Sequence, residues 1–203
     1  MANDIDRRGV LTLSLGAILA AAAGRPALAL QTGVAEGLID RLVADINGII
    51  NSGRTEGQMF GDFERLFNKY ADVSLISQFA LSRRITSVIS SGELRAFEQA
   101  FVGYIARKYG RRFREFIGGR VEVNRSQQLR EDTVMVTTTA ILRGVDPFRV
   151  DFQVSDRGGK PLFVDMKVEG ISLLRSEQQE IQAMYDQAGR SIAGLIARVK
   201  QAG

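Results

Sequence analysis

The spacing of apolar positions divides this chain into a helical part, a part made of strands, and a final helix. As far as Phe116, apolar residues recur every three or four positions, which is the period of a helix with one buried face. The pattern predicts helices over residues 34–50 and 56–69, a short helix for which Asp72 is the N-cap, and a long helix from Gly92 to about Phe116. Four helices therefore precede the first strand.

The long helix has the most distinctive sequence of the four. Ser90 and Glu93 have the spacing of a capping box, in which each side chain satisfies a backbone amide at the start of the helix. One face of the helix is aromatic, and a stripe at this spacing is usually core. The stripe comprises Leu94, Phe97, Phe101, Tyr104, Ile105, Tyr109 and Phe113.

After Gly118 and Gly119 the period shortens to two, which is typical of strands. Apolar and polar residues alternate over residues 121–124, 134–142, 148–154 and 162–169. The connections are short and rich in turn-forming residues, so these four strands should form an antiparallel meander. A last helix is expected from about Ser176 to Val199. Helices should cover the apolar face of the sheet, which makes the fold α+β, with one domain over residues 30–203.

Residues 1–29 have the composition of an export signal rather than of a folded segment. Arg7 and Arg8 precede a mild apolar run of about 14 residues, which is too short to span a membrane. Ala27 and Ala29 supply the A-x-A pattern of a cleavage site, so we expect the signal to be removed near Ala29.

The paired arginines make this signal resemble one for the twin-arginine (Tat) export route. Asp6 and Thr12 depart from the best form of the Tat motif, so Sec export stays open. Either route delivers the mature chain, from Leu30 onward, outside the cytoplasm, and we expect a bacterial periplasm.

Two absences limit the chemistry of the chain. It has no cysteine and no histidine, which removes disulfides, thiol chemistry, the commonest metal ligand and the commonest general base. We therefore expect no metal site and no cofactor. The net charge of +4 could suit a nucleic acid, but the basic residues are scattered and paired with acidic ones. We expect no nucleic-acid binding, and a surface that is simply solvated or that meets anionic head groups or an acidic partner.

Three segments, in order along the chain, carry a resemblance to a known family. The first is Tyr70-Ala71-Asp72-Val73 with Phe79-Ala80-Leu81, the second is the aromatic helix from Phe97 to Gly110, and the third runs from Val164 to Ser172 and into the final helix at Arg175. From about residue 34 to residue 200 the chain resembles the MlaC family, also called the toluene-tolerance family. Two positions depart from the family pattern: Ser82 stands where Gly is common, and Pro161 where Trp is common.

The resemblance implies a periplasmic carrier of phospholipids that belongs to an ABC-type lipid transport system. It implies a four-stranded, strongly curved, cone-like sheet and an apolar cavity that takes acyl chains while the head group stays outside. The expected partners are a phospholipid, an inner-membrane ABC complex and an outer-membrane lipoprotein and porin complex. The expected role is to move lipid between them and so maintain the lipid asymmetry of the outer membrane. We expect a monomer. The direction of transport, the head-group preference and the number of chains stay open.

We place the cavity between the inward strand positions and the aromatic helix. The candidate wall residues are Phe79, Ile85, Phe97, Phe101, Ile105, Val136, Thr138, Phe152, Val154, Val164 and Met166. For each of them, the alternative is that the side chain fills a solid core. The candidates for contact with the head group are Arg83, Arg84 and Arg149, for which a solvated surface arginine is the alternative.

Two other classes of function compete with a carrier. Cone-shaped α+β folds often host isomerases and dehydratases, in which Asp151 and Asp165 would be a carboxylate pair and Tyr104 or Tyr109 a proton donor. Both aspartates alternate with inward strand positions, so we expect them to face outward and the chain not to be an enzyme. The third class is a periplasmic adaptor that binds proteins and no lipid, with its cavity closed by side chains.

Overall fold

The computed structural model describes residues 29–111 and 119–203, which include helices α1 to α6 and strands β1 to β5. Arg7, Arg8 and Ala27 of the expected export signal lie outside these residues, as do Phe113 and Phe116 at the expected end of the long helix. None of the described helices is long and apolar enough to cross a membrane.

The described part of the first half contains four helices, and two of them begin at the caps that the sequence predicts. The four helices are α1 (Thr32–Ile50), α2 (Glu56–Tyr70), α3 (Val73–Thr86) and α4 (Ser91–Gly110). Asp72 caps α3 by accepting a hydrogen bond from the backbone N–H of Leu75, and Ser90 and Glu93 form the expected capping box of α4.

The sheet is an antiparallel meander in the order β1-β2-β3-β4-β5. Its strands are β1 (Arg120–Arg130), β2 (Thr133–Ile141), β3 (Phe148–Ser155), β4 (Leu162–Val168) and the two-residue β5 (Ile171–Ser172). The four expected strands are present, and β5 adds a short fifth one that leads directly into a helix. The antiparallel α+β fold is therefore confirmed.

The C-terminal helix differs from the expectation of one continuous helix. It is two helices, α5 (Leu173–Gln187) and α6 (Ile192–Gln201). The chain turns between them because Gly189 and Arg190 have positive φ angles of 65° and 60°, which a helix cannot contain. Ser191 then caps α6 by accepting a hydrogen bond from the backbone N–H of Gly194.

A kink divides α3 at Ser82, whose φ of 60° and ψ of 167° are not helical. Helical hydrogen bonding is lost around the kink, and side chains of α5 replace part of it. The amide of Gln178 donates to the carbonyl of Phe79, and that of Gln182 donates to the carbonyls of Ala80 and Leu81. These bonds attach α5 to α3 along one side of the helical region.

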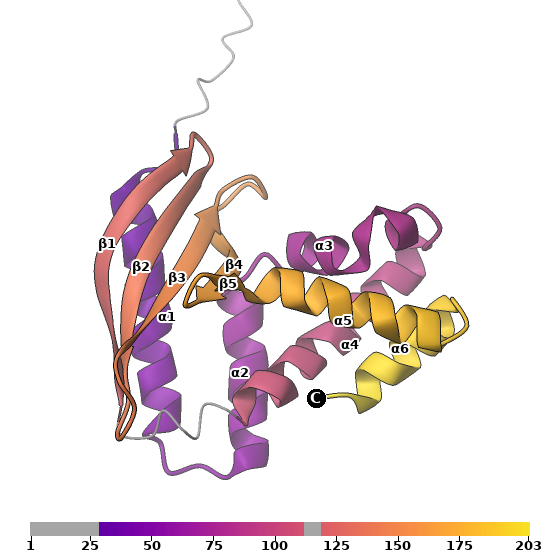
Figure 1. The fold of residues 1–203 in the computed structure, drawn as a ribbon, viewed down its shortest axis with the longest axis horizontal. Helices are drawn as coiled ribbons and strands as arrows, with labels where there is room; N and C mark the ends of the chain where they lie inside the picture. Colours follow the sequence, from indigo (N-terminus) through magenta and orange to yellow (C-terminus); the bar gives the residue numbers. More distant parts are fainter. Residues whose placement is uncertain (1–28, 112–118) are drawn as a thin grey trace, which may run out of the picture.

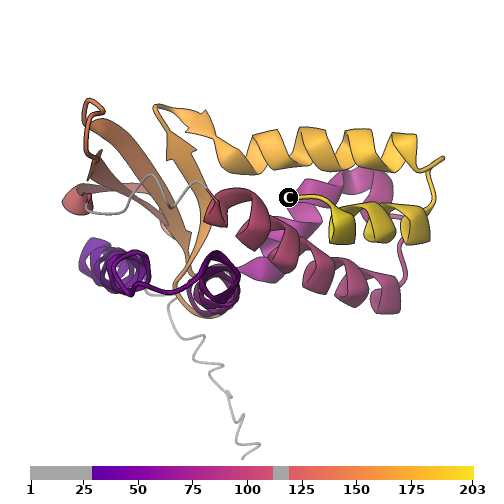
Figure 2. The same ribbon diagram turned by 90° about the horizontal axis from the view of Figure 1, so that it is seen from below.

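The elements form two adjoining packing units, which Figures 1 and 2 show from two directions. In one, α1 lies against the apolar face of the sheet, with α2 beside it. In the other, α3, α4, α5 and α6 pack on one another beyond the edge of the sheet. Each unit has its own buried apolar cluster, and Phe163 of β4 packs against both.

Candidate functional site

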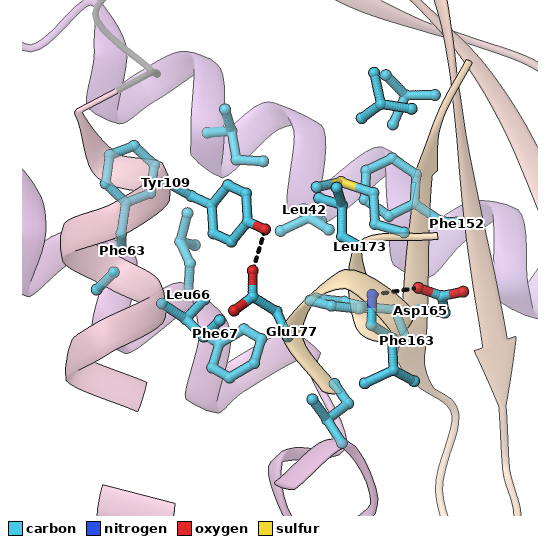
Figure 3. Close-up of a pocket in the computed structure, with 18 of the residues that line it drawn as sticks. Leu42, Phe63, Leu66, Phe67, Tyr109, Phe152, Phe163, Asp165, Leu173 and Glu177 are labelled. Carbon is cyan, nitrogen blue, oxygen red and sulfur yellow. Dashed lines mark hydrogen bonds between the residues drawn. The ribbon is translucent and has the colours of Figure 1, made fainter. Parts of the chain in front are cut away.

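An apolar cavity lies where the two packing units meet. Its volume is about 200 Å³, and it is walled by the sheet, α1, α2, α4 and the start of α5. Figure 3 shows aromatic and aliphatic side chains from these elements converging on the cavity. Its walls are hydrocarbon apart from a few polar groups, among which are Tyr109, Asp165 and Glu177. Such a space suits an apolar ligand, because an unpaired polar group of a ligand would lose its hydrogen bonds to water there.

Five of the eleven expected wall residues line this cavity: Phe101, Ile105, Phe152, Val164 and Met166. Phe101 and Ile105 come from α4, and the other three come from β3 and β4. The aromatic helix and the inward strand positions therefore do meet at a cavity, although only at one end of the helix.

The other expected wall residues lie elsewhere. Val136, Thr138 and Val154 are buried in the sheet, where Thr138 donates its hydroxyl to the carbonyl of Val150. Ile85 and Phe97 are fully buried in the helical unit. Phe79 leaves 38% of its surface exposed on α3.

The prediction did not separate these positions from the cavity wall, because periodicity shows which face of an element is buried but not what that face packs against. Phe97 lies two turns before Ile105 on the same stripe, yet it packs in the helical unit. That unit needs its own core, and the N-terminal half of α4 supplies part of it.

The helices α1 and α2 contribute wall residues that the sequence patterns did not single out. They are Leu42, Val43 and Ile46 of α1 and Phe63, Leu66 and Phe67 of α2. Their helical spacing was visible, but it is equally compatible with packing against a solid sheet.

Phe163 is the clearest wall residue that alternation assigned to the wrong face. The register between β3 and β4 shifts beyond Gln153, so that Val154 pairs with Phe163 rather than with Val164. This bulge turns the ring of Phe163 inward, where it lies 6.0 Å from the ring of Phe67 and 6.2 Å from that of Phe152.

The arginine candidates for head-group contact are not brought together. Arg84 forms an ion pair with Asp186 on the helical unit, and Arg83 is exposed on the same part of α3. Arg149 lies on the outer face of the sheet, where it forms an ion pair with Asp151 at 2.8 Å. That hydrogen-bonded ion pair raises the pKa of Arg149.

The two strand aspartates have separate partners. Asp151 is on the outer face, as expected, but only 3% of its surface is exposed, because Arg149 and the hydroxyl of Thr137 cover and bond its carboxylate. Asp165 does not face outward. It lines the cavity edge and accepts hydrogen bonds from the hydroxyl of Ser172 and the backbone N–H of Leu174, which fixes the start of α5 to β4.

A polar cluster around Glu177 interrupts the hydrocarbon wall between α4 and α5. Only 3% of the surface of Glu177 is exposed, and its carboxylate accepts hydrogen bonds from the hydroxyls of Tyr104 and Tyr109 and from the ammonium of Lys108. Burial, and then the neighbouring carboxylate of Glu177, raise the pKa of Tyr104, so its hydroxyl stays protonated as a donor. The sequence had placed these tyrosines on the aromatic stripe and had marked them as candidate proton donors, without a partner for either hydroxyl.

Comparison with known proteins places this geometry in a family. The family model of the MlaC protein matches residues 38–201, which is most of the chain and includes the cavity-lining residues named above. The chain belongs to the MlaC family.

The fold of this MlaC family member also matches a solved structure. That structure is the phospholipid-binding protein from Ralstonia solanacearum in complex with a phospholipid, at a TM-score of 0.71 and 17% sequence identity. The match covers 82% of this chain and 95% of that one. No curated protein sequence matched the chain. At 17% identity the likeness shows a shared fold.

Proposed function

We propose that this chain is a periplasmic carrier that binds a phospholipid by its acyl chains. The observation that carries the proposal is the apolar cavity at the junction of the sheet with α4 and α5. Membership of the MlaC family and the fold shared with a phospholipid complex support it. The expected export signal before Leu30 supports the location.

The energetics of hydrocarbon burial suit a shuttle rather than a store. Burying one methylene group gains about 0.8 kcal/mol relative to water, so a chain of about 16 carbons gains on the order of 12 kcal/mol. In a bilayer the same chain is already out of water, and its transfer into a closed apolar cavity is close to neutral. A carrier of this kind protects the chain in transit and can still release it to a membrane complex.

The proposal extends to partners and role. The carrier exchanges lipid with an inner-membrane ABC complex and with an outer-membrane lipoprotein and porin complex, and the exchange maintains the lipid asymmetry of the outer membrane. The chain performs no catalysis, and its polar cavity groups serve the structure of the site.

The test is to express the chain with its own signal, purify the mature protein from the periplasm and record a native mass spectrum. We expect a bound phospholipid, whose head group and chains are then identified after extraction. A ligand-free mass that persists after incubation with phospholipid vesicles would contradict the carrier, and would favour an adaptor that binds proteins alone.

A matched pair of variants connects the ligand to the cavity. Ala106 lines the cavity, whereas Ala100, one and a half turns earlier on the same helix, is buried in the helical unit. Ala106→Leu should lower lipid occupancy, because the added methyl groups take space that the ligand needs. Ala100→Leu should lower the stability through overpacking, by about 1–3 kcal/mol, and leave the occupancy of the folded protein unchanged. Equal occupancy in Ala106→Leu and the parent would place the ligand elsewhere.

A further inference from the structure

The cavity is small for a phospholipid, which is the ligand proposed above. Its volume is about 200 Å³, whereas an apolar cavity of about 150 Å³ holds one benzene molecule. In that proportion the space takes on the order of eight carbon atoms, which is less than one long acyl chain and much less than two. One long chain therefore already requires the cavity to widen, and a phospholipid with two chains requires it to widen much further.

The walls differ in how readily they can separate. The contacts of α1 and α2 with the sheet are mainly apolar, apart from the hydrogen bond that Ser126 of β1 donates to Glu36 of α1, so separating them would expose hydrocarbon to water. The sheet itself is held by backbone hydrogen bonds between all neighbouring strands from β1 to β4, with only local shifts in register. The wall between α4 and α5 is different, because a polar cluster closes it, and polar groups can exchange their hydrogen bonds for bonds to water at small net cost.

The geometry of this polar cluster connects the sheet ends of the two helices. Tyr104, Lys108 and Tyr109 extend from α4, and Glu177 meets all three from α5. Lys108 also forms an ion pair with Glu180 of α5. The Lys108 side chain leaves 27% of its surface exposed, which gives water a route to the cluster.

The far ends of the same helices are held differently. Phe97 and Ala100 of α4 share a buried apolar cluster with Ile181 and Tyr185 of α5. That cluster also contains residues of α3 and α6, so α4 and α5 are held at this end by a solid core of four helices. The polar cluster at the other end can open while this core stays packed.

We infer that Tyr104, Lys108, Tyr109 and Glu177 form a latch between α4 and α5, whose opening admits a second acyl chain. The inference rests on the proposed function. The closed latch keeps the cavity narrow. When the hydrogen bonds to Glu177 are exchanged for water, the start of α5 moves away from α4 together with β4, to which Asp165 fixes it, and the cavity gains the width of another chain. The four residues thus determine how many chains the carrier accepts.

One variant weakens the latch without leaving a buried group unpaired. Tyr109→Phe removes one donor to Glu177, while Lys108 remains bonded to the same carboxylate oxygen. The measurement is competition, in native mass spectra, between phosphatidylethanolamine and lysophosphatidylethanolamine with chains of the same length. We expect Tyr109→Phe to shift the ratio of bound lipids toward the two-chain form by about tenfold, because the opening costs less.

The matched control removes a tyrosine–carboxylate hydrogen bond outside the cavity. The hydroxyl of Tyr70 donates to Asp45 at 2.7 Å between α2 and α1, so Tyr70→Phe should leave the ratio unchanged. A role of Tyr109 in stability alone would weaken the binding of both lipids and would not move their ratio. An unchanged ratio in Tyr109→Phe would overturn the latch.

A second measurement keeps the sequence of the latch intact. Because the chain has no cysteine, spin labels can be placed at the exposed positions Asn68 of α2 and Arg175 of α5, on either side of the cavity, and at Gln99 and Ala183 near the far end. The two-chain lipid should lengthen the Asn68–Arg175 distance more than the one-chain lipid does, and should leave the Gln99–Ala183 distance unchanged. If both lipids bind with no change in the Asn68–Arg175 distance, the latch proposal is wrong and the proposed carrier function is retained. If neither lipid binds, the proposed carrier function is wrong.

Discussion

Replacing Ser82 with glycine should stabilise this protein, although the residue lies inside a helix. Its φ of 60° and ψ of 167° fall in a region that essentially only glycine occupies, and any other residue there destabilises the folded state by about 1–3 kcal/mol. Glycine offsets about 0.4–1 kcal/mol of this gain, because its greater conformational freedom favours the unfolded chain. Ser82→Gly should therefore raise the free energy of unfolding by about 1 kcal/mol, or the melting temperature by about 2–4 °C.

The surrounding contacts explain why the strained geometry persists. Gln178 and Gln182 of α5 satisfy the carbonyls of the three residues before Ser82, and Thr86 donates its hydroxyl to the carbonyl of Ser82 itself. All of these bonds involve the backbone of α3, so glycine at position 82 preserves every one of them. The MlaC family commonly has glycine at this place, which agrees with the direction of the effect.

Chemical denaturation with a helical control is the assay. Gln78 is exposed in the regular part of the same helix, and Gln78→Gly should lower the free energy of unfolding by about 1 kcal/mol. The two substitutions should thus have opposite signs. If Ser82→Gly destabilises the protein as Gln78→Gly does, then position 82 is helical in solution and the account of the kink is wrong.

Three further substitutions test other parts of the structure. Arg107→Ala removes a guanidinium that donates hydrogen bonds to the carbonyls of Val199, Lys200 and Ala202 at the end of α6. The change should lower the free energy of unfolding by about 1–2 kcal/mol and should speed hydrogen exchange more in α6 than in the sheet. Phe97→Leu should lower stability by about 1 kcal/mol and leave lipid occupancy unchanged, whereas a lower occupancy would return this residue to the cavity wall. The hydrogen bond from Lys69 lowers the pKa of Asp45 below its ordinary value of 3.8. The ionised Asp45 therefore stabilises the fold above about pH 3.8, and this stabilisation is lost as the pH falls through the lowered pKa. In acid unfolding titrations, Asp45→Asn should lose less of its free energy of unfolding than the parent protein does.

Local chemistry predicted two helix caps and the strands, because each depends on a few neighbouring residues. Asp72, Ser90 and Glu93 act as caps within one turn of their own positions. The strands follow from alternation, and their short connections left the antiparallel meander as the simple topology. The break between α5 and α6 was missed because the helical spacing of apolar residues continues across Ala188, Gly189 and Arg190. The turn is evident from the positive φ angles of Gly189 and Arg190.

The cavity was harder to predict, because it depends on which buried faces meet. Phe101 and Phe97 are one turn apart on the same stripe, yet the first lines the cavity and the second does not. Phe163 reaches the cavity through a bulge, which changes the register by one residue without any signature in the alternation. Glu177 was not singled out, since a buried glutamate on an amphipathic helix looks like one more polar surface position until its partners on α4 are known.

The two outer strands of the sheet determine how readily another chain could add to its edges. An unpaired strand edge invites another chain to add to the sheet, and this is a common route to aggregation. Here one outer strand, β5, has only two residues, and the other, β1, carries irregularities in its register near Val123 and Gln128. Arg125 and Arg130 are exposed along β1, whereas Arg120 is paired with Glu122 of the same strand. A second copy that approached this edge would meet charged side chains on a distorted backbone. Both margins of the sheet thus disfavour the addition of a second copy.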